Sequence, residues 1–294
     1  MKKKLFGPSR GVSLIEILIA LVISAILIAG TYRVLIGQQK TYTTQDQIAD
    51  MQQNVRIAIN KMIREIRMAG FGGKNNNLNG NNDIITTFMY VNGFPNIINP
   101  SNDIVTDGIA HDQITVVAGY DQIGTLAANA SKDSDTIVVN YESADKRCDT
   151  DKEKYICLNG RNSYLIKPTT DNRIALGDTV TLKEDHAEKE PVFLVKAITY
   201  GLRKDERGTP VLFRDENIEG GRQTIAENIE GLQFRYSLAD GKEADVPANP
   251  KEIRGIWVTV TARTQIEDPE LKGEDRFRRR TLTTYIDVRN LRDP

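Results

Sequence analysis

The chain has few of the side chains from which most enzyme active sites are built. Its 294 residues include two histidines, His111 and His186, and two cysteines, Cys148 and Cys157. No glycine-rich phosphate loop, His-Glu-x-x-His zinc motif or nucleophile elbow occurs in the sequence. Both histidines stand among turn-forming and charged residues, so we expect them in solvated turns. The sequence therefore predicts a protein that is not an enzyme, with no catalytic residue and no cofactor.

An excess of charge of either sign is also absent. Lysine and arginine total 39 against 40 aspartate and glutamate residues, and the net charge is −1. That balance argues against nucleic-acid binding as the function of the whole protein. One basic run with an aromatic residue, Arg276–Arg280, could hold DNA. On a strand its arginines would alternate between faces, and we favour a solvated sheet edge that resists strand addition.

Proline is absent from Val12 to Ala69, and charge is nearly absent from the first part of this stretch. Between Val12 and Gly30 every residue is apolar or small except Glu16. Carried on to Ile36, the run makes a helix long enough to cross a hydrocarbon core of about 30 Å. The sequence predicts a transmembrane segment at 12–36.

Basic residues precede this run and predict its orientation. They should hold the N-terminus on the cytoplasmic side of the membrane and place the rest of the chain on the outer side. These residues are Lys2, Lys3, Lys4 and Arg10.

Glu16 is the anomaly in the apolar run. A carboxylate at the bilayer centre costs about 2.5–3.5 kcal/mol on insertion scales, and less near an interface. Here it stands in the first turn, where the helix N-terminus partly compensates a negative charge. A secretory signal is cut after its apolar region, whereas the candidate cut here, between Gly11 and Val12, comes before it. The alternative is an uncut signal anchor with a stray glutamate.

Beyond the apolar run the helical pattern continues with one apolar stripe. Gly70, followed by Gly72 and Gly73, supplies a stop signal. The sequence predicts one helix over 12–70, about 85–90 Å long, whose second half packs on a domain. The stripe consists of Ile48, Met51, Val55, Ile59, Met62 and Ile66.

The rest of the chain, 71–294, has the pattern of a β-rich domain. In Ile256–Ala262 the apolar residues alternate with Trp257, Thr259 and Thr261 and predict a strand with one buried face. Clustered strands after one long helix indicate an α+β fold. Expected strands are Ile84–Val91, Gln113–Tyr120, Asp135–Tyr141, Tyr164–Lys167, Thr179–Lys183, Pro191–Leu202, Val211–Arg214, Leu232–Leu238, Ile253–Thr264 and Arg279–Val288.

The cysteines enclose a short acidic loop. In an exported chain a close pair such as Cys148 and Cys157 favours a disulfide over metal ligation, for which further ligands are lacking. Asp149, Asp151 and Glu153 alternate within this loop as oxygen ligands for calcium could. The glycine and final glutamate of an EF-hand are missing, which makes them a weak calcium candidate and predicts no other metal site.

The residues Gly11-Val-Ser-Leu-Ile-Glu16 resemble the class III signal of type IV pilins and type II secretion pseudopilins. The resemblance implies cleavage after Gly11 by a prepilin peptidase and N-methylation of Val12, although the usual first mature residue is Phe. It also implies that 1–11 is a leader and that Glu16 acts in subunit assembly. The implied fold is a long helix packed on an antiparallel, sheet-rich domain.

Three later segments resemble PilW-type minor pilins: Asn54–Gly73, Glu227–Tyr236 and Arg279–Asn290. The resemblance implies a minor pilin that is incorporated into a type IV pilus or initiates its assembly, with a place at the fibre tip. Its partners would be other minor pilins and the major pilin, through the N-terminal helix, and the inner-membrane assembly platform. It would start as a single-pass inner-membrane protein and end on the cell surface. The alternatives are a J-type pseudopilin of type II secretion and a signal-anchored periplasmic enzyme or binding protein.

Overall fold

The computed structural model describes residues 11–73, 91–143, 155–167, 172–178, 180–218 and 221–291. The chain divides into two compact units, Met1–Ala49 and Asp50–Pro294. Most of the expected leader, and the expected strand Ile84–Val91 apart from Val91 itself, lie outside the described residues.

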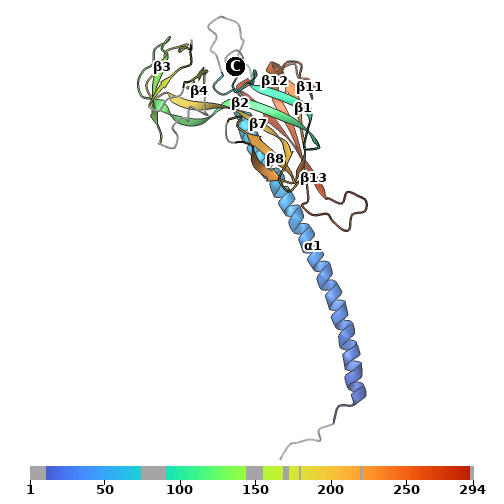
Figure 1. The fold of residues 1–294 in the computed structure, drawn as a ribbon. Coiled ribbons are helices and arrows are strands. Elements are labelled where there is room, and N and C mark those ends of the chain that lie inside the picture. Colours follow the sequence, from blue (N-terminus) through green and yellow to red (C-terminus); the bar gives the residue numbers. More distant parts are fainter. Residues whose placement is uncertain are drawn as a thin grey trace, which may run out of the picture. The chain divides into compact units, whose positions relative to one another are not determined.

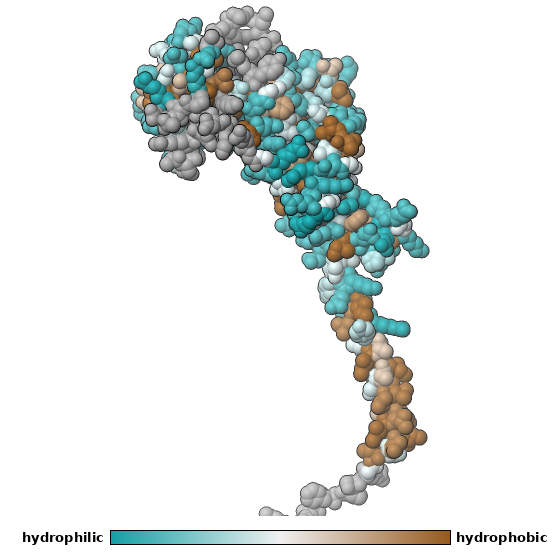
Figure 2. All heavy atoms as spheres, viewed as in Figure 1, coloured by the Kyte–Doolittle hydropathy of each residue, from teal (hydrophilic) through white to brown (hydrophobic). Residues whose placement is uncertain are grey.

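One helix, α1 (Leu14–Met68, 55 residues), runs from the first unit into the second. The prediction of an unbroken helix ending just before Gly70 is confirmed, because neither Gly30 nor Gly37 interrupts it. In the first unit its side chains are almost all exposed, and Figure 2 shows the apolar ones as a brown surface. A helix that is apolar on all sides needs lipid or other helices around it.

The described part of the second unit adds strands to the end of α1, and every strand pairing is antiparallel. The predicted α+β fold, a long apolar N-terminal helix followed by a β-rich domain, is confirmed. The strands are β1 (Ile98–Thr106), β2 (Ile109–Leu126), β3 (Thr136–Tyr141), β4 (Tyr155–Leu158), β5 (Asn162–Leu165), β6 (Arg173–Ala175), β7 (Pro191–Lys204), β8 (Pro210–Asp215), β9 (Gln223–Glu227), β10 (Ile229–Leu238), β11 (Glu243–Ala244), β12 (Ile253–Arg263) and β13 (Arg279–Asp287). Two short 3-10 helices, Pro250–Glu252 and Arg289–Leu291, complete it.

A nine-stranded sheet is built on the long pair β2–β7 (Figure 1). Along one half of this pair, β1 lies beside β2, while β8 and then β9 extend the sheet from β7. Along the other half, β3 and β6 follow β2, and β4 and β5 follow β7. Because β2 is 18 residues long, it holds two different neighbours, β1 and β3, along one edge.

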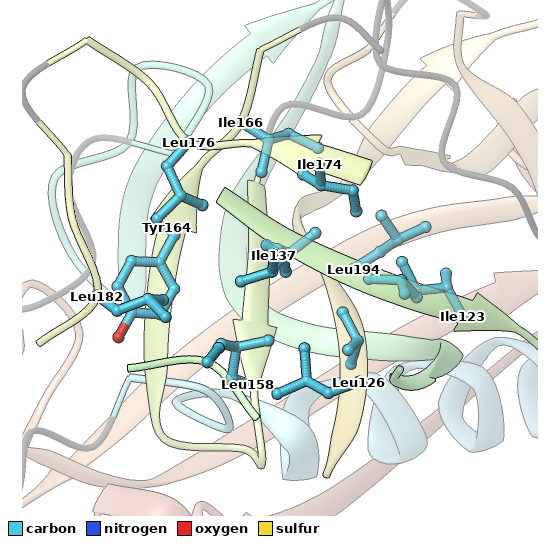
Figure 3. Close-up of a cluster of buried hydrophobic side chains, with 14 residues drawn as sticks. Ile123, Leu126, Ile137, Leu158, Tyr164, Ile166, Ile174, Leu176, Leu182 and Leu194 are labelled. Atoms are coloured by element: carbon cyan, nitrogen blue, oxygen red, sulfur yellow. The ribbon is translucent and has the colours of Figure 1, made fainter. Parts of the chain in front are cut away.

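The β3–β6 half of this sheet has a hydrophobic core of its own (Figure 3). Ile137 of β3, Leu158 of β4 and Tyr164 of β5 pack there with Ile123 and Leu126 of β2. All five side chains are at most 2% exposed. This half of the sheet, built from β3 to β6 with parts of β2 and β7, is therefore a packed part of the second unit and not a surface loop. We call it the β3–β6 lobe.

A four-stranded sheet has the order β11-β10-β12-β13. The alternation predicted for Ile256–Ala262 is confirmed, because the apolar residues of this segment are 0% exposed and Trp257 is 37% exposed. The two sheets are joined by Asp112 of β2, whose Oδ2 accepts a hydrogen bond of 2.8 Å from the backbone N–H of Phe234 in β10.

One strand prediction was wrong, and five strands of the described residues were not predicted. The described residues of Thr179–Lys183 form no strand, although Val180 and Leu182 pack into the core of the β3–β6 lobe from an irregular segment. Conversely, β1, β4, β6, β9 and β11 were not predicted. The sequence of β1 contains Pro100 and several polar residues, and its side chains are mostly half-exposed, so it lacks an apolar strand pattern. β4 directly follows the acidic cysteine loop, with which it was grouped in the sequence.

Candidate functional site

The helix start in the first unit is a capping box. Ser13 precedes the first helical residue, and its backbone N–H donates to Glu16 Oε2 at 2.9 Å. The N–H groups of Glu16 and Ile17 in turn donate to the Ser13 carbonyl at 3.0 and 3.2 Å. This is the Ser-x-x-Glu arrangement, in which the glutamate at the third helical position reaches back to the residue that caps the helix.

This cap places the Glu16 carboxylate beside the candidate cut. Its hydrogen-bond donor, Ser13, is separated from Gly11 only by Val12, whose side chain is 70% exposed. Cleavage after Gly11 would turn the amide nitrogen of Val12 into a free amine one residue from Ser13. The predicted residues Gly11, Val12 and Glu16 thus lie together at the beginning of α1. The cleavage itself stays a prediction.

The apolar part of α1 has no uncompensated polar side chain near its middle. Ser24 Oγ donates to the Ala20 carbonyl at 2.7 Å, and Thr31 Oγ1 donates to the Leu27 carbonyl at 2.8 Å. Such bonds to the preceding turn satisfy hydroxyl groups in lipid. Within α1, a stretch of 18 residues has a mean hydropathy of 2.6, and none of its residues is buried. The helix is therefore long and apolar enough to cross a membrane.

In the second unit one face of α1 packs on the nine-stranded sheet, and the predicted stripe is buried from Met51 onward. Two buried members of this face, Ala58 and Glu65, were not part of the predicted stripe, and Glu65 is only 5% exposed. Ile48, which belongs to the first unit, is partly buried. The buried side chains are Met51, Val55, Ala58, Ile59, Met62, Glu65 and Ile66.

Glu65 is held by donors from two strands and from its own helix. Arg214 Nε of β8 donates to Oε1 and Oε2 at 3.0 and 2.9 Å, and Tyr200 Oη of β7 donates to Oε2 at 2.5 Å. Lys61 Nζ lies 2.7 Å from Oε1. Burial, and then the Glu65 carboxylate, raise the pKa of Tyr200. The charge of Glu65 is therefore compensated within the protein.

The ion pair continues away from the helix. Arg214 Nη1 lies 2.7 Å from Glu216 Oε1, and Lys196 Nζ lies 3.2 Å from Glu216 Oε2. Although burial opposes a charge on Glu216, its hydrogen bond to Arg214 and the charge of Lys196 lower the pKa of its carboxyl. We call Glu65, Arg214, Glu216 and Lys196 the junction network. No signal in the sequence joins these positions, because they come from three separate elements.

The end of α1 is fixed by close backbone contacts. Gly70 and Gly72 have φ angles of 83° and 89°, and their N–H groups donate to Val117 and Gly160 carbonyls at 3.0 Å each. A methyl group on Gly72 would lie 2.6 Å from Cys157 Sγ. Glycine is needed there both for its φ angle and for space.

The histidines are not in solvated turns, which corrects the prediction. Both are 3% exposed. His111 lies on β2 and burial lowers its pKa. His186 Nδ1 lies 2.7 Å from Glu190 Oε2. Polar neighbours in the sequence favour a surface position for a histidine, whereas contacts between distant segments bury both side chains.

The cysteine loop is only partly described. Cys157 lies buried on β4, where burial raises the pKa of its thiol form to about 12. Cys148, Asp149, Asp151 and Glu153 lie outside the described residues, so the disulfide and the calcium site stay predictions. Within the described ranges, no group of three or more His, Cys, Asp or Glu side chains could hold a metal ion.

Arginines of the basic run Arg276–Arg280 form ion pairs near the start of an edge strand. β13 begins at Arg279 and forms one edge of the four-stranded sheet. Arg276 pairs with Glu267, Arg278 with Asp268, and Arg279 with Glu230 and Asp275. Pairing of this kind leaves little free positive charge for a phosphate backbone.

One comparison with known proteins gives a match. Residues 8–32 match the family described as the prokaryotic N-terminal methylation motif, and this range contains Gly11, Val12 and Glu16. The proteins that carry this motif are structural and not enzymatic. No curated protein and no solved structure matches the chain.

Proposed function

Because the methylation motif and the single apolar helix support a membrane-anchored, type IV pilin-like prepilin, we propose that this chain is a minor pilin. Prepilin peptidase cleaves it after Gly11 and methylates Val12. The mature protein then enters the base of a fibre through its N-terminal helix. Its partners are other minor pilins and the major pilin, which present similar helices, and the inner-membrane assembly platform.

The observation that carries this proposal is the position of Glu16. It is the one charged residue between Gly11 and Arg33, on a helix whose side chains in this segment are exposed. Its Oε2 lies 2.9 Å from Ser13 N, close to the place where cleavage would create an amine. An amine of a neighbouring subunit at about 4 Å would attract the carboxylate by several kcal/mol at an effective dielectric near 20.

Two variants separate charge pairing from helix capping. Glu16→Ala removes both, whereas Glu16→Gln keeps a side chain that can complete the capping box but carries no charge. We expect both variants to be cleaved normally and both to enter fibres poorly. Immunoblots of sheared fibres against membrane fractions measure the incorporation. If Glu16→Gln is incorporated as well as the wild type, capping alone explains Glu16 and the pairing role is wrong.

The size of the head supports a place at the fibre tip. Its nine-stranded sheet carries the β3–β6 lobe with a separate hydrophobic core. Such bulk is easier to place at an end than in a repeating shaft, which supports a role in initiating the fibre. Immunogold labelling of the head should mark fibre ends, and even labelling along the shaft would contradict the tip position.

A J-type pseudopilin of type II secretion is the second candidate. The ending Arg67-Met-Ala-Gly70, in which Gly70 has the φ angle of 83° that the turn after α1 requires, favours it because J-type pseudopilins have similar endings. Deletion of the gene distinguishes the two. A minor pilin predicts loss of surface fibres with normal protein secretion, and a pseudopilin predicts the reverse.

A further inference from the structure

A cavity of about 540 Å³ opens on the four-stranded sheet of the second unit. Its walls come from β10, β12 and β13, with contributions from β1, β2 and the region of β11. Figure 1 shows β1, β11 and β12 in the same region of the second unit. Cavities of this size hold small ligands in many proteins. We call it the Trp257 pocket.

The pocket contains the one tryptophan of the chain. Trp257 is 37% exposed, and its neighbour across the strands, Tyr285, is 40% exposed. The two ring centroids lie 4.9 Å apart at an interplanar angle of 52°. Trp257 Nε1 donates to Glu243 Oε1 at 3.0 Å, which fixes the indole ring. Exposed aromatic rings held in place in this way are typical of binding surfaces.

The polar lining combines hydrogen-bond donors and acceptors. Gln233 and Arg235 of β10 lie opposite Thr259 and Trp257 of β12, and Asn102 of β1 also lines the pocket. The amide groups and the Thr259 hydroxyl can each donate and accept. A ligand rich in hydroxyl groups uses both kinds of partner, whereas a cation uses acceptors alone.

The charge of the lining excludes acidic ligands. Four carboxylates, of Asp103, Asp112, Glu243 and Asp245, face one cation, Arg235. Arg235 Nε is already 3.0 Å from Asp245 Oδ1. A phosphate or a uronic acid would therefore meet net negative charge.

The strands that line the pocket are held together by a buried side chain before any ligand binds. The buried Asp112 accepts hydrogen bonds from the backbone N–H groups of Asp103, at 3.1 Å, and Phe234, at 2.8 Å. It thereby ties the irregular part of β1, where Asp103 has a φ of 51°, to β10. A site held by hydrogen bonds before the ligand arrives loses less entropy on binding.

We propose that the Trp257 pocket binds a neutral oligosaccharide. The apolar C–H face of a sugar ring packs on the Trp257 ring, and the hydroxyl groups of the sugar bond to Gln233, Arg235 and the carboxylates around them. The head would thereby recognise a neutral polysaccharide surface. This inference does not depend on whether the chain serves a pilus or a secretion system.

The emission of Trp257 reports on this pocket directly, because the chain has no other tryptophan. The full chain, in a detergent without a sugar head group, is titrated with chitotetraose, cellotetraose, maltotetraose and mannotetraose. Tetragalacturonate and tetralysine serve as the acidic and cationic comparisons. We expect a saturable change in emission with at least one neutral sugar and none with tetragalacturonate.

Two variants on the same sheet face locate the binding. Gln233→Ala removes one exposed lining residue and should weaken the Kd about 3–10-fold, the effect of one hydrogen bond. Thr281→Ala, on β13 outside the pocket, should leave the Kd unchanged. No response to any neutral sugar, a response to a charged probe alone, or an unchanged Kd in Gln233→Ala would each overturn the proposal.

Discussion

Glu65 of α1 and Arg214 of β8 form an ion pair across 149 residues of sequence, with both side chains less than 10% exposed. The Arg214 Nε donates to both carboxylate oxygens, at 3.0 and 2.9 Å. Sliding the helix by one residue along the sheet would separate the two charges and leave both buried. The pair therefore fixes the register of the helix end on the sheet, while the apolar stripe around it supplies contact area without a unique position.

Removal of Glu65 should destabilise the second unit strongly. We expect Glu65→Ala to lower the free energy of unfolding by about 3 kcal/mol, the lower end for a broken buried pair, because Arg214 keeps Glu216. Lys61→Ala is the matched control, since Lys61 contacts the same carboxylate from a side chain that is 36% exposed. It should cost less than about 1 kcal/mol. Urea unfolding of the full chain, followed by Trp257 emission, measures both, and equal losses would contradict a special role of the Arg214 pair.

The junction network also predicts a dependence on pH. The pKa of Glu216 is lowered from its ordinary value of 4.5 in the folded protein, so its contribution to stability is complete above that value. The contribution is lost as pH falls through the lower, folded pKa. Glu216→Gln should therefore lose less stability than the wild type between pH 6 and pH 3. A change at the exposed Glu206, Glu206→Gln, should follow the wild-type curve. Parallel curves for all three proteins would show that Glu216 is not responsible.

Gly72 predicts a steric effect that a second substitution can relieve. Gly72→Ala adds a methyl group 2.6 Å from Cys157 Sγ at a φ of 89°, and we expect a loss of about 1–3 kcal/mol. Gly208→Ala measures the cost of the backbone alone, because Gly208 has a φ of 80° and nothing within 4 Å. Adding Cys157→Ala to Gly72→Ala should recover part of the difference. Additive losses in the double variant would contradict a clash at Cys157.

The cysteine pair gives a chemical prediction. If Cys148 and Cys157 form a disulfide in the exported chain, denatured protein without reductant should take up no alkylating reagent, and reduced protein should take up two equivalents. Mass spectrometry counts the labels. A free Cys157 would instead be alkylated without reductant in the denatured protein but not in the folded one, where burial raises its pKa to about 12. Labelling of the unreduced, denatured protein would therefore reject the disulfide.

Periodic patterns in the sequence were enough for the helix and for most long strands. The helix was expected over 12–70 and runs from Leu14 to Met68, because steps of three and four residues mark its buried face. The alternation around Trp257 likewise gave the buried face of β12. These patterns depend only on residues that are close in sequence. They can therefore be recognised without knowing which distant segments come into contact.

The parts that sequence did not reveal depend on contacts between distant segments. A glutamate such as Glu65 is expected on a helix surface, and only Arg214, Tyr200 and Lys61 together make its burial favourable. His111 was misplaced for the same reason, since its burial on β2 arises from the packing of the sheets. The Trp257 pocket combines residues of six strands, none of which forms a motif alone.

The capping box at the start of α1 could have been predicted from the sequence. Ser13 and Glu16 have the Ser-x-x-Glu spacing that marks a helix start. The charge of Glu16 and the likeness of its surroundings to prepilin signals predicted a role in assembly, and its hydrogen bond to Ser13 adds a second role. The same side chain can therefore cap its own helix before assembly and pair with another subunit afterwards.

The intact mass of the protein extracted from native membranes tests the central claim most directly. The account predicts a polypeptide that begins at Val12, with a mass increased by one methyl group, in cells that contain an active prepilin peptidase. The same cells without the peptidase should give the chain from Met1. A native protein that retains residues 1–11 while the peptidase is active would contradict the account.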